Sequence, residues 1–342
     1  LAKVLLHRVL HVGFQVRPDP TSLNGGVSVS SHPPRGRRYS VTMTALSART
    51  IAADLNGTLL GPDALVMTPA PIADASAQTL TFVGDVERFA AEFARALGLG
   101  ATVFAPEGTE LPEGSPGSVI AVANPRASFG LAVARYFVPA SPTGIAESAR
   151  VHPSAQVHET AYVGEFTVVR EGAVIEAHAE IRDHVVIGRN VVVGSHALVK
   201  SQAVIGEEGF GIEKDADGNN FHVPHIGSVR LGAHTEVGNF TTVCSGTISA
   251  TEVGDYTKID DHVHIAHNCR IGRNVIITAC AEISGSVTIE DDVWIGPNAS
   301  VIQGLTLGRD SLLGIGAVAV KSVPENEVRV GNPAKRLGDN KK

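Results

Sequence analysis

The stretch that decides the fold is VHPSAQVHETAYVGEFTVVREGAVIEAHAEIRDHVVI, residues 151–187, in which every sixth residue is Val or Ile. The count continues to Ile205, resumes over 231–243, slips once, and runs again over 253–313. A six-residue period of this length predicts short strands that bend at regular corners and stack into a parallel β-helix. Gly commonly follows the apolar residue, as in Ile187-Gly188, and is expected to supply a turn conformation that other residues resist. Burial of the inward Val and Ile side chains would hold such a solenoid together.

Composition and charge exclude several classes of protein. The chain has 342 residues, of which 43% are apolar and 18% are charged, enough for more than one buried core. The sequence contains no run of 18 apolar residues, so no integral membrane segment is predicted. The net charge of −7 comes without a basic stripe, which disfavours nucleic acid as a partner. Three cysteines without CxxC spacing favour neither disulfides nor a zinc ribbon and indicate a reducing compartment: Cys244, Cys269 and Cys280.

Residues 1–42 differ in composition from the rest of the chain. Six basic side chains face a single acid, Asp19, and Ser, Gly and Pro crowd positions 21–36. This composition predicts a disordered basic tail or leader, and it also fits an organelle transit segment. The favoured interpretation is that the chain proper begins at Met43 and works in the cytoplasm, with organelle import as the less favoured alternative.

Residues 43–140 alternate short apolar runs with helical spacing, which predicts a small α/β domain. The expected strands are Thr79–Val83 and Ser118–Ala123. Asp85 and Asn124 follow these strands at positions where a side chain caps a helix, and a proline suited to the first helical turn comes after Asn124. The domain carries no phosphate-loop spacing, so by itself it predicts only a small binding module.

The remaining chain divides by its repeat. We expect a linker over 141–150, the β-helix over 151–320 and a tail over 321–342. The repeat is broken by an insertion at 206–225, and insertions in a solenoid must loop outward, where they often line the binding face.

This insertion carries an aromatic residue between glycines and two histidines. We predict that it binds substrate through Phe210, Gly211, His222 and His225. The alternative is a surface loop without a role.

A histidine and a glycine one coil apart indicate acyl transfer. His267 lies two residues after the inward Ile265, and one coil of 18 residues further on lies Gly285. A histidine is a base near neutral pH, and a glycine N–H can approach an oxyanion closely. His262 and His264 are weaker candidates. No zinc motif is completed by these histidines, so no metal site is predicted.

The repeat resembles that of the hexapeptide-repeat family of left-handed parallel β-helices, with three hexads in each triangular coil. Members are mostly acyltransferases that work as homotrimers with active sites between adjacent prisms. The α/β domain, the Gly-Phe-Gly loop, Ile259-Asp260-Asp261 and Ile265-Ala266-His267-Asn268 together are similar to the UDP-3-O-acylglucosamine N-acyltransferases of the lipid A pathway.

That resemblance implies roles for particular residues. His267 would be the general base that takes a proton from the glucosamine amine, and the Gly285 amide would polarise the thioester carbonyl. Phe82 matches the aromatic residue that stacks on uracil, so Phe82 and Asp85 are expected to bind substrate and the α/β domain would be a nucleotide-binding domain. The chain departs from the family pattern at three positions: Asp85 replaces an Asn, Arg88 a Tyr and Leu305 a His.

The C-terminal part instead resembles hexapeptide acetyltransferases that use acetyl-CoA. The segments that carry this resemblance are 292–296, 314–317 and 330–336. It implies that the donor is bound by residues of these last coils and of the tail: Trp294, Gly314, Gly316, Asn332, Lys335 and Arg336.

The sequence therefore predicts an N-acyltransferase that moves an acyl group from acyl carrier protein or CoA to the amine of a nucleotide-linked amino sugar. Asp260 or Asp261 is expected to orient His267, Asn268 to contact substrate, and Cys269 to be a buried filler and not a nucleophile. No tightly bound cofactor is expected, because the acyl thioester is a co-substrate. Two alternatives stay open: an acetyl-CoA-dependent amino-sugar N-acetyltransferase, and a non-catalytic or metal-binding β-helix subunit.

Overall fold

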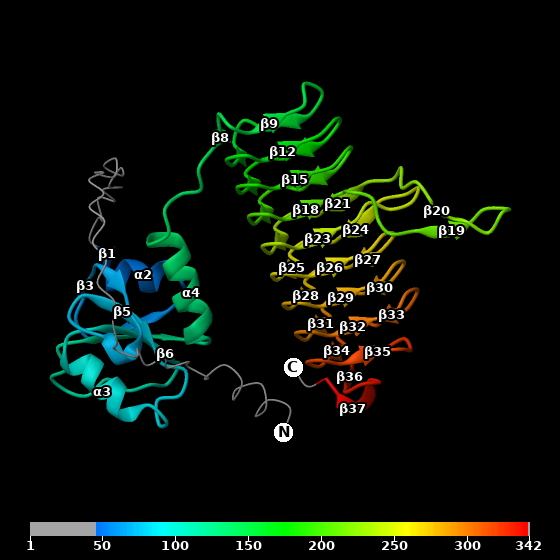
Figure 1. Cartoon of the computed structure of the whole chain (residues 1–342). Helices are drawn as coiled ribbons and strands as arrows, with labels where there is room; N and C mark the ends of the chain where they lie inside the picture. Colours follow the sequence, from blue (N-terminus) through cyan, green and yellow to red (C-terminus); the bar gives the residue numbers. More distant parts are fainter. Residues whose placement is uncertain (1–45, 341–342) are drawn as a thin grey trace, which may run out of the picture. The chain divides into compact units, whose positions relative to one another are not determined.

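The computed structural model describes residues 46–340, and the chain divides into two compact units, the first ending at Pro139 and the second beginning at Ala140 (Figure 1). The predicted tail or leader at 1–42 lies outside the described residues. None of the helices between residues 46 and 340 is long and apolar enough to cross a membrane.

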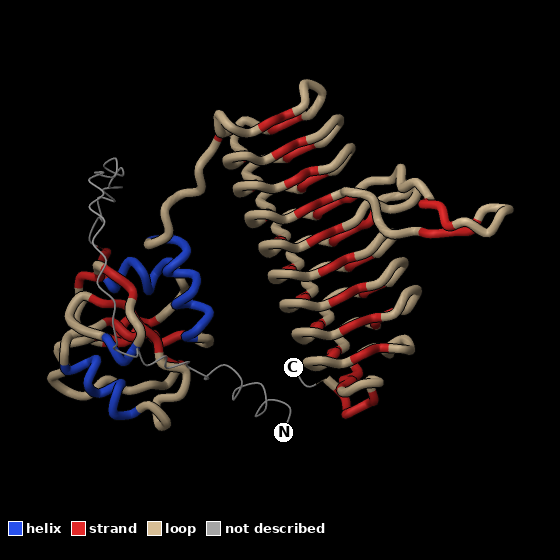
Figure 2. The backbone as a smooth tube through the Cα atoms, viewed as in Figure 1, coloured by secondary structure: helices blue, strands red, loops and turns tan. Residues whose placement is uncertain are grey.

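The described part of the first unit is a small α/β fold. Its sheet has the order β2-β7-β6-β5-β4, in which β2 is antiparallel to β7 and the other neighbours are parallel. The helices lie on the two faces of this sheet (Figure 2). The strands are β1 Leu46–Ser47, β2 Thr58–Leu60, β3 Leu65–Val66, β4 Thr68–Pro69, β5 Thr79–Phe82, β6 Thr102–Pro106 and β7 Ser118–Val122. The helices are α2 Ala48–Asp54, the 3-10 turn η1 Ile72–Asp74, α3 Ala90–Gly98 and α4 Pro125–Tyr136.

One of the two predicted helix caps is confirmed and the other is wrong. Asn124 caps α4, because its side chain accepts a hydrogen bond from Ala127 N–H at 3.1 Å. The helix expected directly after Asp85 begins only at Ala90. The Asp85 carboxylate accepts a hydrogen bond from Arg88 N–H at 2.9 Å and stabilises a turn that precedes α3.

The predicted parallel β-helix is confirmed (Figure 1). In the described part of the chain, strands of two to five residues form three sheets that run the length of the solenoid. The first holds β10 Gln156–Val157, β13 Val174–Ile175, β16 Val192–Val193, β21 Val229–Leu231, β24 Thr251–Val253, β27 Arg270–Ile271, β30 Thr288–Ile289 and β33 Thr306–Leu307.

The second sheet holds β8 Gly144–Ile145, β11 Tyr162–Val163, β14 Glu180–Ile181, β17 Leu198–Val199, β22 Glu236–Val237, β25 Lys258–Ile259, β28 Ile276–Ile277, β31 Trp294–Ile295, β34 Leu312–Leu313, β36 Glu327–Val330 and β37 Lys335–Asp339. The third holds β9 Arg150–Val151, β12 Val168–Val169, β15 Val186–Ile187, β18 Val204–Ile205, β23 Thr242–Val243, β26 His264–Ile265, β29 Glu282–Ile283, β32 Ser300–Val301 and β35 Val318–Ala319. β8 lies in the expected linker but pairs with β11, and β36 lies in the expected tail but pairs with β34. The solenoid therefore extends beyond the expected range 151–320 at both ends.

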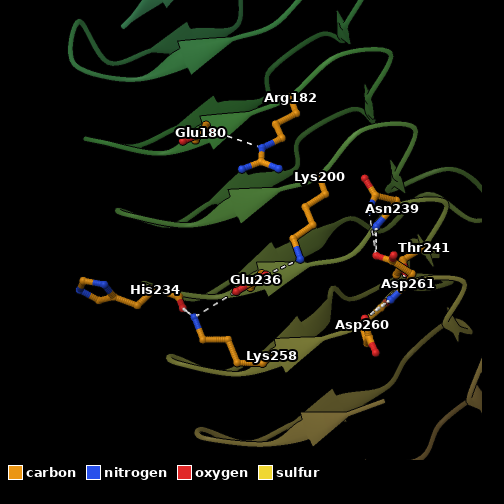
Figure 3. Close-up of polar contacts among 10 residues, drawn as sticks. All are labelled: Glu180, Arg182, Lys200, His234, Glu236, Asn239, Thr241, Lys258, Asp260 and Asp261. Carbon is orange, nitrogen blue, oxygen red and sulfur yellow. Dashed lines mark hydrogen bonds and ion pairs between the residues drawn. The ribbon is translucent and has the colours of Figure 1, made fainter. Parts of the chain in front are cut away.

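Strand pairing shows how the coils are built. Val163 pairs with Ile181 and Ile181 with Val199, so a regular coil takes 18 residues. The inward side chains of successive coils form an apolar column, in which Ile187 and Ile265 have no exposed surface. On the outside of the second sheet, Glu236 on β22 pairs with Lys200 at 2.6 Å and Lys258 at 3.9 Å (Figure 3). These partly exposed ion pairs join adjacent rungs, but burial of the column supplies most of the stabilisation.

The role expected for the repeat glycines is wrong. Gly188 is not left-handed, and a methyl group built on it would lie 2.3 Å from the carbonyl oxygen of Gly206. It is needed because two coils approach closely there. The left-handed corner falls three residues after the inward position, at residues such as Phe166, His178 and Asn190, with φ of 57°, 59° and 54°.

Candidate active site

The two breaks in the repeat meet at one corner of the solenoid. β18, β23, β26 and β29 are neighbours in the third sheet, so the turns that follow them lie on successive coils. These turns are the insertion 206–225, a bulge at 244–250, the His267 turn and the Gly285 turn. The insertion forms an arm, in which β19 Ile212–Lys214 pairs with β20 Asn220–His222, and this arm projects from the solenoid (Figure 1).

Backbone hydrogen bonds join the insertion to the bulge. Ser245 N–H donates to Glu207 O at 2.9 Å, and Ile226 N–H donates to Thr247 O at 2.9 Å. The bulge is the slip in the six-residue count between Val243 and Val253. The break in the six-residue count was the sequence signal for this bulge, although the sequence alone gave the bulge no role.

His267 packs directly against Gly285. A methyl group built on Gly285 would lie 2.7 Å from His267 Cε1 and 2.9 Å from Nε2, so only glycine leaves room for the ring. Ser286 N–H donates to His267 O at 2.9 Å and fixes the two turns together. Among residues 46–340, the Gly285 N–H has no hydrogen-bond acceptor. A base and an unused backbone donor therefore lie side by side.

Asn268 holds the His267 ring, with its Nδ2 at 3.2 Å from His267 Nδ1. The same amide is fixed by the bulge, because Asn268 Oδ1 accepts from Thr247 N–H at 2.8 Å and Nδ2 donates to Thr247 Oγ1 at 3.2 Å. Thr247 is thus a supporting residue that sequence reasoning missed.

The aspartate predicted to orient His267 does not contact it. Asp261 Oδ1 accepts from Asn239 N–H at 2.7 Å and from Asn239 Nδ2 at 3.0 Å, and the Asp260 side-chain Oδ1 accepts from Asp261 N–H at 2.8 Å (Figure 3). Both aspartates are used inside a different corner of the coil. The prediction that an aspartate orients His267 is therefore wrong, and the side chain that contacts the ring is that of Asn268.

Burial sets the protonation of the two groups that could react. Burial, and then repulsion from the His225 imidazole, lower the pKa of His267, so the ring is mostly neutral at neutral pH and can accept a proton. Burial raises the pKa of the Cys269 thiol to about 12. This thiol donates to Ser284 O at 3.2 Å and is held in the protonated, unreactive form.

The insertion residues predicted to bind substrate have different environments. His225 is buried, and a methyl group built on Gly211 would lie 3.0 Å from its Cε1. His222 Nε2 donates to Gly209 O at 2.9 Å, whereas Phe210 is 84% exposed. A polar cavity of about 460 Å³ lies beside this corner, lined by Arg170, Arg189, Glu207, Glu208, His225 and Ser245 among others.

Phe82 and Asp85 belong to the first unit. The Phe82 ring is half-buried on β5 and lies 5.1 Å from the Phe129 ring, so part of its surface is already packed. Asp85 lines a cavity of about 420 Å³ together with Glu87, Glu107 and Glu110.

The residues predicted to bind the donor lie in the last coils. Gly314 N–H donates to Arg329 O and Gly316 N–H donates to Pro297 O, both at 2.8 Å, so these amides serve the scaffold. Trp294 is half-buried on β31, while Asn332, Lys335 and Arg336 are exposed, and Arg336 pairs with Asp339.

The class that the fold and the repeat define is the hexapeptide-repeat β-helix. Residues 166–201 and 250–285 match the model of the bacterial transferase hexapeptide (six repeats), and residues 286–318 match the hexapeptide repeat of succinyl-transferase.

Within this class, the resemblance to UDP-3-O-acylglucosamine N-acyltransferases is confirmed. The chain is 39% identical over 133 residues to the one of Caulobacter sp. (strain K31), a match that covers 39% of each chain. It is 44% identical over 84 residues to that of Cytophaga hutchinsonii, covering 25% of this chain and 24% of the relative. The match thus spans no more than about two fifths of the length of these curated relatives.

Among solved structures, the chain resembles the UDP-N-acetylglucosamine O-acyltransferase of Moraxella catarrhalis. The identity is 28% and the TM-score 0.54, and the alignment covers 58% of this chain and 75% of that one.

Proposed function

We propose that the chain is an N-acyltransferase that moves an acyl group from a thioester, carried by acyl carrier protein or CoA, to the amine of a nucleotide-linked amino sugar. The observation that carries this proposal is the neutral His267 ring packed against Gly285, whose N–H has no acceptor among the described residues. The similarity to UDP-3-O-acylglucosamine N-acyltransferases supports the choice of acceptor.

The chemistry needs only these groups. The amine nitrogen attacks the thioester carbonyl carbon, and the Gly285 N–H stabilises the oxygen that becomes negative. His267 takes one proton from the attacking nitrogen and returns it to the departing sulfur, so an amide and a thiol are the products. Because His267 Nδ1 accepts from Asn268 Nδ2 at 3.2 Å, this transfer requires that the ring give up that hydrogen bond or change tautomer when substrate binds. Cys269 takes no part, because its thiol stays protonated.

The cavity beside the insertion suits the polar part of the acceptor. Its lining mixes the cations Arg170 and Arg189 with the acids Glu207 and Glu208. Arg170 is paired with Glu207 at 2.7 Å, so the cavity offers hydrogen-bond partners without a large excess of either charge.

The donor distinguishes two versions of this proposal. The exposed Lys335 and Arg336 on β37 favour CoA, whose phosphates they could meet, whereas the relatives are named for acylglucosamine acylation.

Among residues 46–340, no three His, Cys, Asp or Glu side chains lie together in a way that could hold a metal ion.

We expect the full chain to release thiol from a long-chain acyl carrier protein when UDP-3-O-acylglucosamine is present. Thiol release and mass spectrometry of the sugar product would measure this reaction. The control is glucosamine without a nucleotide, which should react far more slowly. Faster reaction with acetyl-CoA would select the N-acetyltransferase, and no reaction with either donor would contradict both versions.

The site is proposed to be completed by neighbouring copies in a homotrimer. Phe210, Ile226 and Ile248 are 84%, 73% and 73% exposed on the insertion and the bulge that flank His267. Apolar groups clustered in this way favour burial against another surface.

A cytoplasmic location stays a prediction.

Sedimentation equilibrium is expected to give three times the mass of the chain. Replacing Phe210 and Ile226 by Ser should weaken the assembly by about tenfold or more, because two apolar contacts are lost. Phe166→Ser is the control, since Phe166 is 61% exposed at another corner and should leave the mass unchanged. A wild-type chain that sediments as a monomer at micromolar concentration would contradict the trimer.

A further inference from the structure

His225 is a buried histidine with a polar atom left over. Its side chain lies at the end of the insertion and is 6% exposed. Nδ1 is 2.8 Å from Val223 O, and because a carbonyl only accepts, Nδ1 carries a proton. The neutral ring therefore has its lone pair on Nε2, which is buried without a hydrogen-bond partner. A buried acceptor without a partner destabilises a fold, so its retention calls for a reason.

The ring of His225 contacts the ring of His267. The centroids are 5.0 Å apart and the planes meet at 66°, an edge-to-face arrangement. On the side of the insertion, Gly209 packs against both rings, because a methyl group built on it would lie 3.1 Å from His267 Cδ2 and 3.2 Å from His225 Nε2. His267 is thus held between Gly285 on one side and the insertion on the other.

Few other charged or titratable groups face this pair. On the insertion, Glu208 is 3.4 Å from His222, whose ring lies 5.6 Å from that of His225. On the next coil, Glu282 accepts a hydrogen bond from Ser284, and the Cys269 thiol is uncharged.

At the cavity, Arg170 and Glu207 pair with each other. Within the described residues, His225 is the one imidazole whose ring contacts that of His267.

We propose that His225 is a positioning residue for His267, acting through the ring contact that holds the His267 imidazole against Gly285. This inference rests on the proposed function only where it gives His267 a part in catalysis. The insertion then has a definite role: it brings a second imidazole to the base.

The direction of the pH effect follows from the charges. Burial and repulsion from His225 both lower the pKa of His267. Removing His225 removes the repulsion, so the pKa of His267 rises. Because the base works in its neutral form, the acidic limb of the pH–rate profile moves to higher pH.

His225→Phe keeps a ring of similar size and therefore most of the burial, whereas His225→Gln keeps a donor for Val223 O but admits more water. We expect the pKa of His267 to rise in the Phe variant, because the repulsion is lost, and to rise further in the Gln variant, because burial is reduced as well. The ¹³Cε1–¹H signals of labelled histidines in the full chain would give this pKa. In assays near neutral pH, kcat should fall by about 3- to 10-fold with KM within about twofold.

The matched control is His264→Phe, since His264 is exposed on β26, bonds to Thr242 and should leave the His267 pKa unchanged. An unchanged His267 pKa in both His225 variants would overturn the proposal. So would a raised KM with unchanged kcat and pKa, because His225 would then bind substrate. If the pKa moves but the wild-type chain acylates no amino sugar, the ring coupling stands and the proposed function fails, so the two failures are distinguishable.

Discussion

Replacing His267 by Ala is expected to lower kcat by about 10²–10⁴-fold, the usual contribution of a positioned general base. The amine of an amino sugar must lose a proton as it attacks, and His267 is the neutral imidazole beside the free Gly285 N–H. The loss should appear in kcat and kcat/KM alike, because the proton moves in the transition state. The fold should survive, since His267 lies outside the apolar column and is half-buried.

Steady-state rates of thiol release would measure this effect, with thermal unfolding to confirm that the variant is folded. His264→Ala is the matched control, because it removes an exposed imidazole three residues away on the same coil. The pH profile of the wild-type kcat/KM should show an acidic limb at the lowered pKa of His267 beside the limb from protonation of the substrate amine, and only the His267 limb should vanish in His267→Ala. Turnover equal to that of the wild type would remove His267 from the mechanism.

Gly285→Ala is expected to lower kcat by about 10²-fold while the stability changes little. The added methyl group would lie 2.7 Å from His267 Cε1, so the ring must move away from the reacting atoms. A displacement of about 1 Å at a catalytic group can lower the rate 10²-fold. The backbone of Gly285 is not left-handed, and the atoms that must yield are the end of one side chain, so folding should tolerate the change.

A double-mutant cycle separates displacement of the ring from loss of the backbone donor. If Gly285→Ala acts through the ring, it should have almost no further effect in a His267→Ala background. Gly338→Ala is the glycine control, because a methyl group there meets no atom within 4 Å. Full activity of Gly285→Ala would show that the ring contact is not needed for turnover.

Much of the second unit was predictable because each coil repeats the same local rule. The six-residue count placed Ile265 and Ile283 inward, and a coil of 18 residues placed Gly285 beside His267. A spacing argument works here because neighbouring coils stack in register, so the separation in sequence fixes the separation in space. The helix expected after Asp85 shows the limit of such reasoning, since the cap residue stabilised a separate turn.

The support around His267 was not predictable in the same way. Asp260 and Asp261 lie close to His267 in sequence, yet their carboxylates accept hydrogen bonds from Asp261 N–H and from Asn239. The residue that holds the ring is Asn268, and its amide is fixed by Thr247 from a bulge on the preceding coil. A break in a repeat shows that residues have been inserted, but it does not predict which residues they contact.

The six-residue period predicts the solenoid, its core and the rung shared by His267 and Gly285, because a strict period admits one stacking register and buries one set of side chains. The meeting of the insertion and the bulge at the His267 corner, which brings His225 and Thr247 there, is seen only in the folded chain. It could not be predicted because irregular segments follow no period. Their contacts are set by hydrogen bonds and packing between coils, which exist only once the coils have stacked.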